Sequence, residues 1–65
     1  MKFSELLRML KKDGWYEIRQ SGSHIIMRHP SKRNQISVPN HPSEEVKTGT
    51  LRSILKDAEI ETRKR

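Results

Sequence analysis

The sequence predicts one small α+β domain in which a helix, three strands and a second helix follow one another, with a three-stranded antiparallel sheet. Apolar residues recur with helical spacing within residues 3–10 and again within residues 51–58. Between these segments, three short runs alternate apolar and polar residues and are separated by turn residues, which is typical of a meander. Two helices with one apolar face each are expected to cover the same face of the sheet.

The first helix is expected from Ser4 to Asp13, with Ser4 as its N-cap. Gly14 follows two lysines and Asp13, as a glycine does just beyond the last turn of a helix. The second helix is expected from Thr48 to Ala58, with Thr48 as its N-cap.

The three strands are expected at residues 15–20, 24–29 and 35–38, and residues 30–34 read as a turn with two adjacent cations. In the first run, alternation directs Tyr16 and Ile18 toward the core.

The second run determines which residues face away from the helices. If Ile25 and Met27 point toward the helices, His24, Ile26 and Arg28 lie on the open face, where Ile26 would be exposed.

Sixty-five residues allow one domain, residues 1–65, and residues 60–65 are expected to form a frayed basic tail. One compact core is expected from residues with the correct periodicity. They are Phe3, Leu6, Leu10, Ile18, Ile25, Met27, Ile36, Val38, Leu51, Ile54 and Leu55.

The charge balance favours a polyanionic partner, because 14 Lys and Arg residues against 8 Asp and Glu residues give a net charge of +6. The chain has no cysteine and no apolar run long enough for a membrane span, so we expect a cytoplasmic protein without a membrane partner. Its three histidines lack the spacing of metal ligands, and we predict neither a metal nor another cofactor.

The most informative stretch is Ser21-Gly22-Ser23-His24, which places an imidazole at the start of the second strand, beside a tight turn. An imidazole acts as both acid and base near neutral pH. On a basic surface, such a residue is suited to cutting RNA without a metal, with the RNA 2′-OH as nucleophile. Taken alone, a single histidine at such a position is more often a simple turn or surface residue than a catalytic one.

Five motifs in sequence carry a resemblance that covers nearly the whole chain. They are Leu10-Lys11-Lys12-Asp13-Gly14-Trp15, Gly22-Ser23-His24, Arg28-His29-Pro30, Val38-Pro39-Asn40-His41 and Gly49-Thr50-Leu51-Arg52-Ser53-Ile54-Leu55. In this order they resemble the HicA family of bacterial toxins. The C-terminal residues 59–65 have no counterpart in this resemblance.

The resemblance implies a fold similar to double-stranded-RNA-binding domains and an mRNA interferase, that is, an endoribonuclease acting on mRNA. It also implies that the histidine after Gly-Ser, His24, is catalytic. A HicB-type antitoxin is the implied protein partner, and we expect it to silence the toxin by covering His24.

Substrate binding is predicted at Gly22 and Ser23, through turn N–H groups, and at Arg28, Lys32 and Arg33, as a cationic edge beside His24. A local role in the turn or a solvated hairpin remains the alternative for each of them. His29 is expected to be structural, because its odd offset from His24 places it on the opposite face. His41 either lines the site or caps a local loop.

Two other functions remain open. One is a non-catalytic RNA-binding module on the same fold, although only Lys47 is cationic at the start of the second helix, where duplex-binding domains present a lysine cluster. The other is an interaction protein whose positive surface docks an acidic partner.

Overall fold

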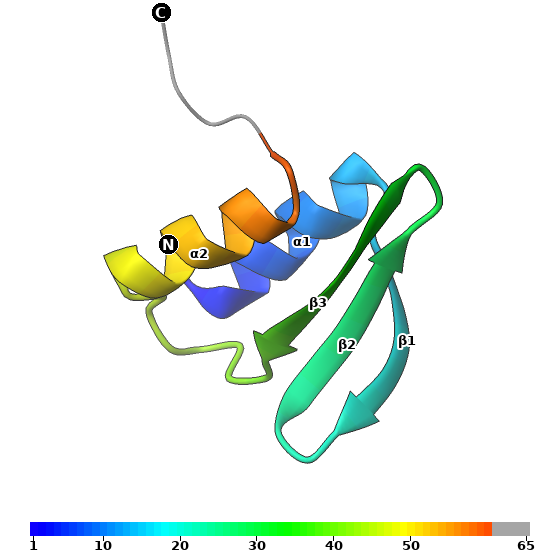
Figure 1. Cartoon of the computed structure of the whole chain (residues 1–65). Coiled ribbons are helices and arrows are strands. Elements are labelled where there is room, and N and C mark those ends of the chain that lie inside the picture. The colour runs from blue at the N-terminus through cyan, green and yellow to red at the C-terminus, as the bar shows by residue number, and fades with distance from the viewer. Residues whose placement is uncertain (61–65) are drawn as a thin grey trace, which may run out of the picture.

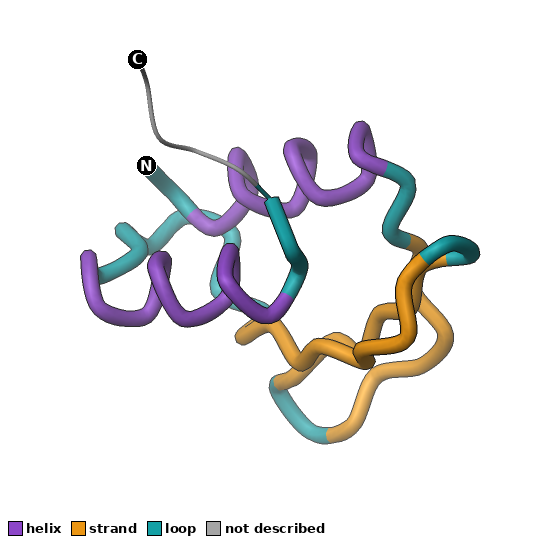
Figure 2. Tube along the Cα trace, turned by 45° about the horizontal axis from the view of Figure 1, so that its top comes forward, coloured by secondary structure: helices purple, strands orange, loops and turns teal. Residues whose placement is uncertain are grey.

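A computed structural model describes residues 1–60 and confirms the predicted element order. The elements are α1 (Phe3–Asp13), β1 (Tyr16–Ser21), β2 (His24–His29), β3 (Lys32–Pro39) and α2 (Thr48–Asp57), shown in Figure 1. The strands form one antiparallel sheet in the order β1-β2-β3. Both helices lie over the same face of that sheet (Figure 2).

The core lies between the helices and the sheet, as the periodicity predicts. Nine of the eleven predicted core residues are buried, and Leu51 is partly buried against them. Four buried residues were absent from the predicted core: Trp15, Ile26, Val46 and Ala58. Trp15 is only 2% exposed and packs where α1 passes into β1.

Ile18 is the predicted core residue that the structure places in solvent, with 42% exposure. A β-bulge interrupts the register of β1 between Glu17 and Arg19, and Ile18 is its extra residue. The bulge reverses the expected alternation, so that Glu17 faces the same side as Met27 and Tyr16 the same side as Arg28. The prediction that Tyr16 and Ile18 face the core was therefore wrong.

Ile26 was predicted to be exposed on the open face, but its side chain is buried, with 8% exposure. It lies in the central strand, between Arg19 of β1 and Ser37 of β3, and outside the cluster that packs under the helices. Side chains on both neighbouring strands shield a central-strand residue from water. Its parity was correct, but its exposure was not.

The first turn of α1 is anchored by tertiary contacts, and Ser4 is not its N-cap. The helix begins at Phe3 after Lys2, whose N–H donates to Glu5 Oε1 at 2.7 Å. The N–H groups of Phe3 and Ser4 donate to the carbonyls of Glu44 and Pro42. A loop distant in sequence thus supplies the acceptors that an N-cap side chain usually provides.

The N-cap of α2 is Lys47 instead of the predicted Thr48, and β3 is longer than predicted because it begins at Lys32. Residue Ile60 packs against the core, whereas residues 61–65 of the predicted tail lie outside the described residues. No helix within the described part of the chain is long and apolar enough to cross a membrane.

Candidate active site

His24 begins β2 and its side chain is exposed. The two-residue turn before it is formed by Gly22, with φ of +60°, and Ser23. The Ser23 carbonyl accepts a hydrogen bond from the N–H of Asn40 at 2.7 Å, which joins this turn to the end of β3. The start of β2 is therefore fixed on both sides, by β1 through the turn and by β3.

Two shallow surface hollows meet at His24. The first, of about 420 Å³, is the β3–α2 hollow, and its polar lining consists mainly of Ser37, Thr50, Ser53 and Asp57. The second, of about 360 Å³, is the loop hollow. It is lined by Phe3, Ser23, His24, Pro39, His41, Glu44, Glu45, Lys47 and Thr50. His24, Pro39 and Thr50 border both hollows, so a substrate in either one would lie beside the imidazole.

His41 and Lys47 are functional candidates that the sequence indicated only weakly. The ring of His41 packs edge-on against Phe3, with 6.4 Å between the ring centroids, and His41 lines the loop hollow together with His24. Lys47 lines the same hollow just before α2. Only the folded chain brings this loop beside the turn at Gly22, because the two segments are far apart in sequence.

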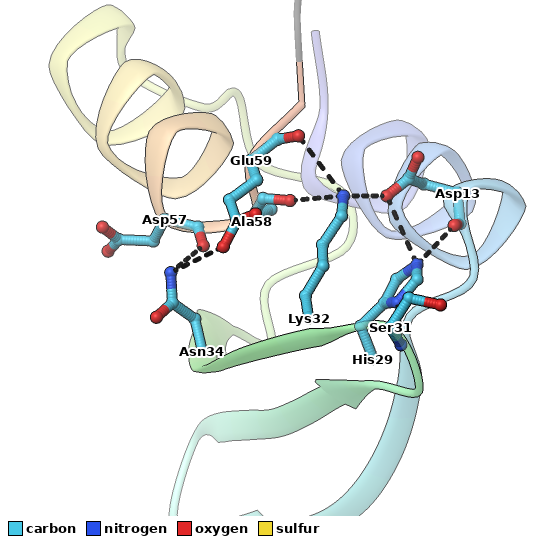
Figure 3. A network of polar contacts seen from close by, with 8 residues as sticks. All are labelled: Asp13, His29, Ser31, Lys32, Asn34, Asp57, Ala58 and Glu59. Atoms are coloured by element: carbon cyan, nitrogen blue, oxygen red, sulfur yellow. Dashed lines mark hydrogen bonds and ion pairs between the residues drawn. The ribbon is translucent and has the colours of Figure 1, made fainter.

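The opposite end of the sheet holds a second polar network, drawn in Figure 3. Lys32 Nζ lies 2.7 Å from Asp13 Oδ2 and 2.8 Å from the carbonyl oxygen of Ala58. Asn34 Nδ2 donates to the carbonyl of Asp57 at 2.8 Å. The carbonyls of Asp57 and Ala58 lie at the C-terminal end of α2. Side chains of β3 therefore donate to acceptors that the end of the helix leaves without intrahelical partners.

His29 belongs to this network, as its predicted structural role implies. Its Nδ1 accepts the N–H of Ser31 at 3.0 Å, and its Nε2 lies 2.7 Å from the carbonyl oxygen of Asp13. Because Nδ1 accepts, the proton of the neutral ring is on Nε2, which donates to Asp13 at the end of α1. The β2–β3 hairpin thereby caps both helices.

The Lys32 ammonium donates a hydrogen bond to the Asp13 carboxylate and thereby holds the pKa of that carboxyl below its usual value. It also lies 5.8 Å from the centre of the Trp15 ring. Its side chain is only 17% exposed. The contacts of Lys32 are therefore those of a structural residue, and its predicted role in binding substrate gains no support from them.

The structure does not bring all predicted site residues together. Gly22 and Ser23 adjoin His24, and Arg28 lies on the same side of β2 as His24. Lys32 is in register with His29, about 17 Å along the sheet from His24 at ~3.3 Å per residue. Arg33 follows Lys32 and is equally remote, so the cationic edge expected beside His24 is absent from the described residues.

Within residues 1–60, no group of three or more His, Cys, Asp or Glu side chains is arranged to hold a metal ion.

In a comparison with protein families, residues 3–60 match a family model. The matching family is described as the HicA toxin of bacterial toxin-antitoxin. No curated protein matches the chain.

Proposed function

This chain belongs to the family of HicA toxins of bacterial toxin–antitoxin systems, and on that premise we propose that it is an endoribonuclease that cleaves RNA with His24. As a member of that family the chain is a toxin, and its partner is an antitoxin. One observation supports the catalytic role most strongly. His24 is exposed where two surface hollows meet, beside a turn whose backbone is open to solvent.

In the proposed reaction, the His24 imidazole takes the proton of a ribose 2′-OH as general base. The 2′-oxygen attacks the adjacent phosphorus, and the bond from phosphorus to the 5′-oxygen breaks. The products are a 2′,3′-cyclic phosphate and a 5′-OH, the latter formed when the leaving oxygen gains a proton. RNA carries its own nucleophile, so the protein needs to supply only acid–base groups and charge stabilisation.

Lys47 and the turn at Gly22 and Ser23 are suited to stabilising the negative charge that develops on the phosphate. Lys47 and Ser23 line the loop hollow with His24. Within residues 1–60, and apart from Gly22 and its two chain neighbours, no heavy atom lies within 4 Å of the position that a Gly22 Cβ would occupy, so a phosphate can approach the turn backbone. Arg28 and Arg33 are assigned to phosphates further along the RNA.

His41 is the proposed general acid for the leaving 5′-oxygen. It lines the same hollow as His24, and its edge-on contact with Phe3 orients the ring. Two histidines on one hollow can divide the work, one taking the 2′-OH proton and the other giving a proton to the leaving group.

Cleavage of a short RNA by the purified protein, with product analysis, tests the proposal. His24→Ala is expected to lower the rate by about 10²–10⁴-fold. RNA with a 2′-deoxy residue at the cut position should bind and resist cleavage. Cleavage of the deoxy substrate, or loss of activity with a chelator, would contradict the 2′-OH mechanism.

A substrate with sulfur in place of the 5′-oxygen separates the two histidines, because a thiolate leaves without protonation. His41→Ala should be slow on the ordinary RNA and close to wild type on the sulfur substrate. His24→Ala should stay slow on both. A His41→Ala variant that the sulfur substrate does not rescue would exclude His41 as the acid.

The antitoxin is proposed to be of the HicB type and to cover His24. A complex in which His24 remains open to RNA would contradict steric inhibition. The alternative function, a non-catalytic RNA-binding module, predicts the same binding but no cleavage that depends on His24.

A further inference from the structure

The face of the sheet turned away from the helices is cationic. Glu17 is the only carboxylate residue in the three strands, and its Oε2 lies 3.0 Å from Lys11 Nζ of α1, on the helix side. Two basic residues, His29 and Lys32, also contact the helix ends. The remaining basic residues of the strands, apart from His24, are three arginines.

The register of β1 with β2 places Arg19 and Arg28 on the open face, and alternation along β3 places Arg33 there. Arg28 shares its side of β2 with Ile26, and Arg19 of β1 is paired with Ile26. In β3, Lys32 and Asn34 reach the helix ends, so Arg33, which lies between them, points the other way.

Tyr16 and Gln35 complete this surface. Tyr16 is paired with Arg28 across the strands, and Gln35 Oε1 lies 3.4 Å from Arg28 Nη1. We call the surface formed by Tyr16, Arg19, Arg28, Arg33 and Gln35 the arginine face.

The arginines of this face are not neutralised by the protein. Within residues 1–60, none of them forms an ion pair, and all three are exposed. Guanidinium groups are planar donors suited to phosphate oxygens. Three guanidinium groups lie on this surface and no carboxylate lies among them. Such a surface is complementary to the successive phosphates of a nucleic-acid backbone.

Tyr16 indicates which form of nucleic acid fits. Its side chain is 49% exposed, which is high for a large aromatic residue, and it lies among the arginines. An exposed ring on a sheet is a stacking platform for an unpaired base, and stacking of this kind does not depend on base identity. A duplex keeps its bases inside the helix, so it gains nothing from this ring.

The arginine face also leads to the candidate active site. Arg28 and His24 are four residues apart on the same side of β2, about 13 Å at ~3.3 Å per residue. We infer that a single-stranded segment of the RNA substrate lies along the arginine face, with its phosphates on Arg19, Arg28 and Arg33 and a base on Tyr16. The inference rests on the proposed function for its substrate, and it defines the surface by which the toxin holds RNA next to His24.

RNA affinity measured in a His24→Ala background tests the inference without cleavage. The probe is a labelled, unstructured oligoribonucleotide of about twelve nucleotides, within the ~4–16 that such surfaces occupy. Arg19→Glu and Arg28→Glu should each weaken binding at least about tenfold and reduce the salt slope by about 0.7 per lost phosphate contact. Arg8→Glu, an exposed arginine of α1, makes the same change in net charge and should weaken binding less than about threefold, since it removes only long-range attraction.

Stacking is tested at Tyr16. Tyr16→Ala should weaken binding about tenfold, and Tyr16→Phe, which keeps the ring, less than about twofold. Amide shifts of the His24→Ala protein titrated with the same RNA provide a measurement that needs no surface variant. They should change along β1 and β2 and not on the exposed side of α1.

The outcomes distinguish this inference from the proposed function. Equal losses for Arg19→Glu and Arg8→Glu, or shifts confined to the helices, would refute the arginine face while leaving cleavage by His24 intact. An RNA duplex that binds as tightly as the single strand would refute the stacking of an unpaired base. If the arginine variants lose binding but the wild type cleaves no RNA, the inferred surface stands and the proposed nuclease does not.

Discussion

Gly14→Ala should destabilise this protein more than any other substitution of glycine by alanine. Gly14 ends α1 with φ of +114°, a conformation that side chains with a Cβ rarely adopt. A Cβ at this position would also lie 2.6 Å from Nε2 of His29. The ring cannot retreat freely, because that nitrogen is bound to the Asp13 carbonyl at 2.7 Å.

The magnitude follows from these two costs. Forcing alanine into a sparsely populated backbone region costs about 1–3 kcal/mol. Displacing the His29 ring removes its hydrogen bond to Asp13, worth about 0.5–1.5 kcal/mol. The total of about 1.5–4.5 kcal/mol corresponds to a melting temperature lower by about 6–36 °C, at ~4–8 °C per kcal/mol for a domain of this size.

Thermal unfolding followed by circular dichroism measures the effect, and the other two glycines are matched controls. Gly49 lies in α2 without a positive φ or a neighbour near its missing Cβ, so Gly49→Ala should be neutral or stabilising by up to about 1 kcal/mol. Gly22 has a φ of +60° but open space around it, so Gly22→Ala should cost about 1–2 kcal/mol from the backbone alone.

The His29 contact is isolated by a double-mutant cycle. With the ring removed by His29→Ala, the added cost of Gly14→Ala should fall to the backbone cost, about 1–3 kcal/mol. Equal melting temperatures for the Gly14→Ala and Gly49→Ala proteins would refute this reasoning. Strictly additive changes in the cycle would refute the part assigned to the ring.

Two further predictions concern stability. The Asp13 carboxyl has its pKa lowered by the Lys32 hydrogen bond, so its stabilising contribution is complete above the usual aspartate pKa of about 3.9 and disappears as the pH falls through the lower folded-state pKa. At about pH 7, Asp13→Asn should therefore lower the urea midpoint by the equivalent of no more than ~1 kcal/mol, because the carboxylate is 36% exposed. Well below the pKa of Asp13, the same substitution should change the urea midpoint little. Equal losses at both pH values would contradict this prediction. Leu10→Ala should cost about 2–5 kcal/mol because Leu10 is fully buried, and Leu7→Ala, at a half-buried site on the same helix, should cost clearly less.

The fold was largely predictable because each element carries a strong local signal. Helical spacing in residues 3–10 and 51–58 and alternation in β2 define faces that only one layered arrangement buries. Where prediction failed, the local signal was overridden by neighbours in space. The bulge at Ile18 reversed the sides of Tyr16 and Glu17, and an isolated strand pattern contains no sign of such an extra residue.

The candidate site was predicted in part. The position of His24 beside a turn follows from the chain near it, because the Gly22-Ser23 turn and the start of β2 are local features. The roles of Lys32 and Arg33 did not follow, because adjacent basic residues look alike in sequence. Only the tertiary structure shows that Lys32 points to the helix ends and Arg33 to the open face.

The sequence by itself determined the element order, most of the core and the residue at the start of β2, since these depend on periodicity and turn chemistry over a few neighbouring residues. The tertiary structure decided which basic side chains of the sheet are held by the protein and which face solvent. Lys32 and His29 are held by the ends of α2 and α1, because helix ends leave carbonyls that need donors. Arg19 and Arg28 remain on the open face because of the β1–β2 register, and Arg33 because it alternates with Lys32 and Asn34, which reach the helix ends.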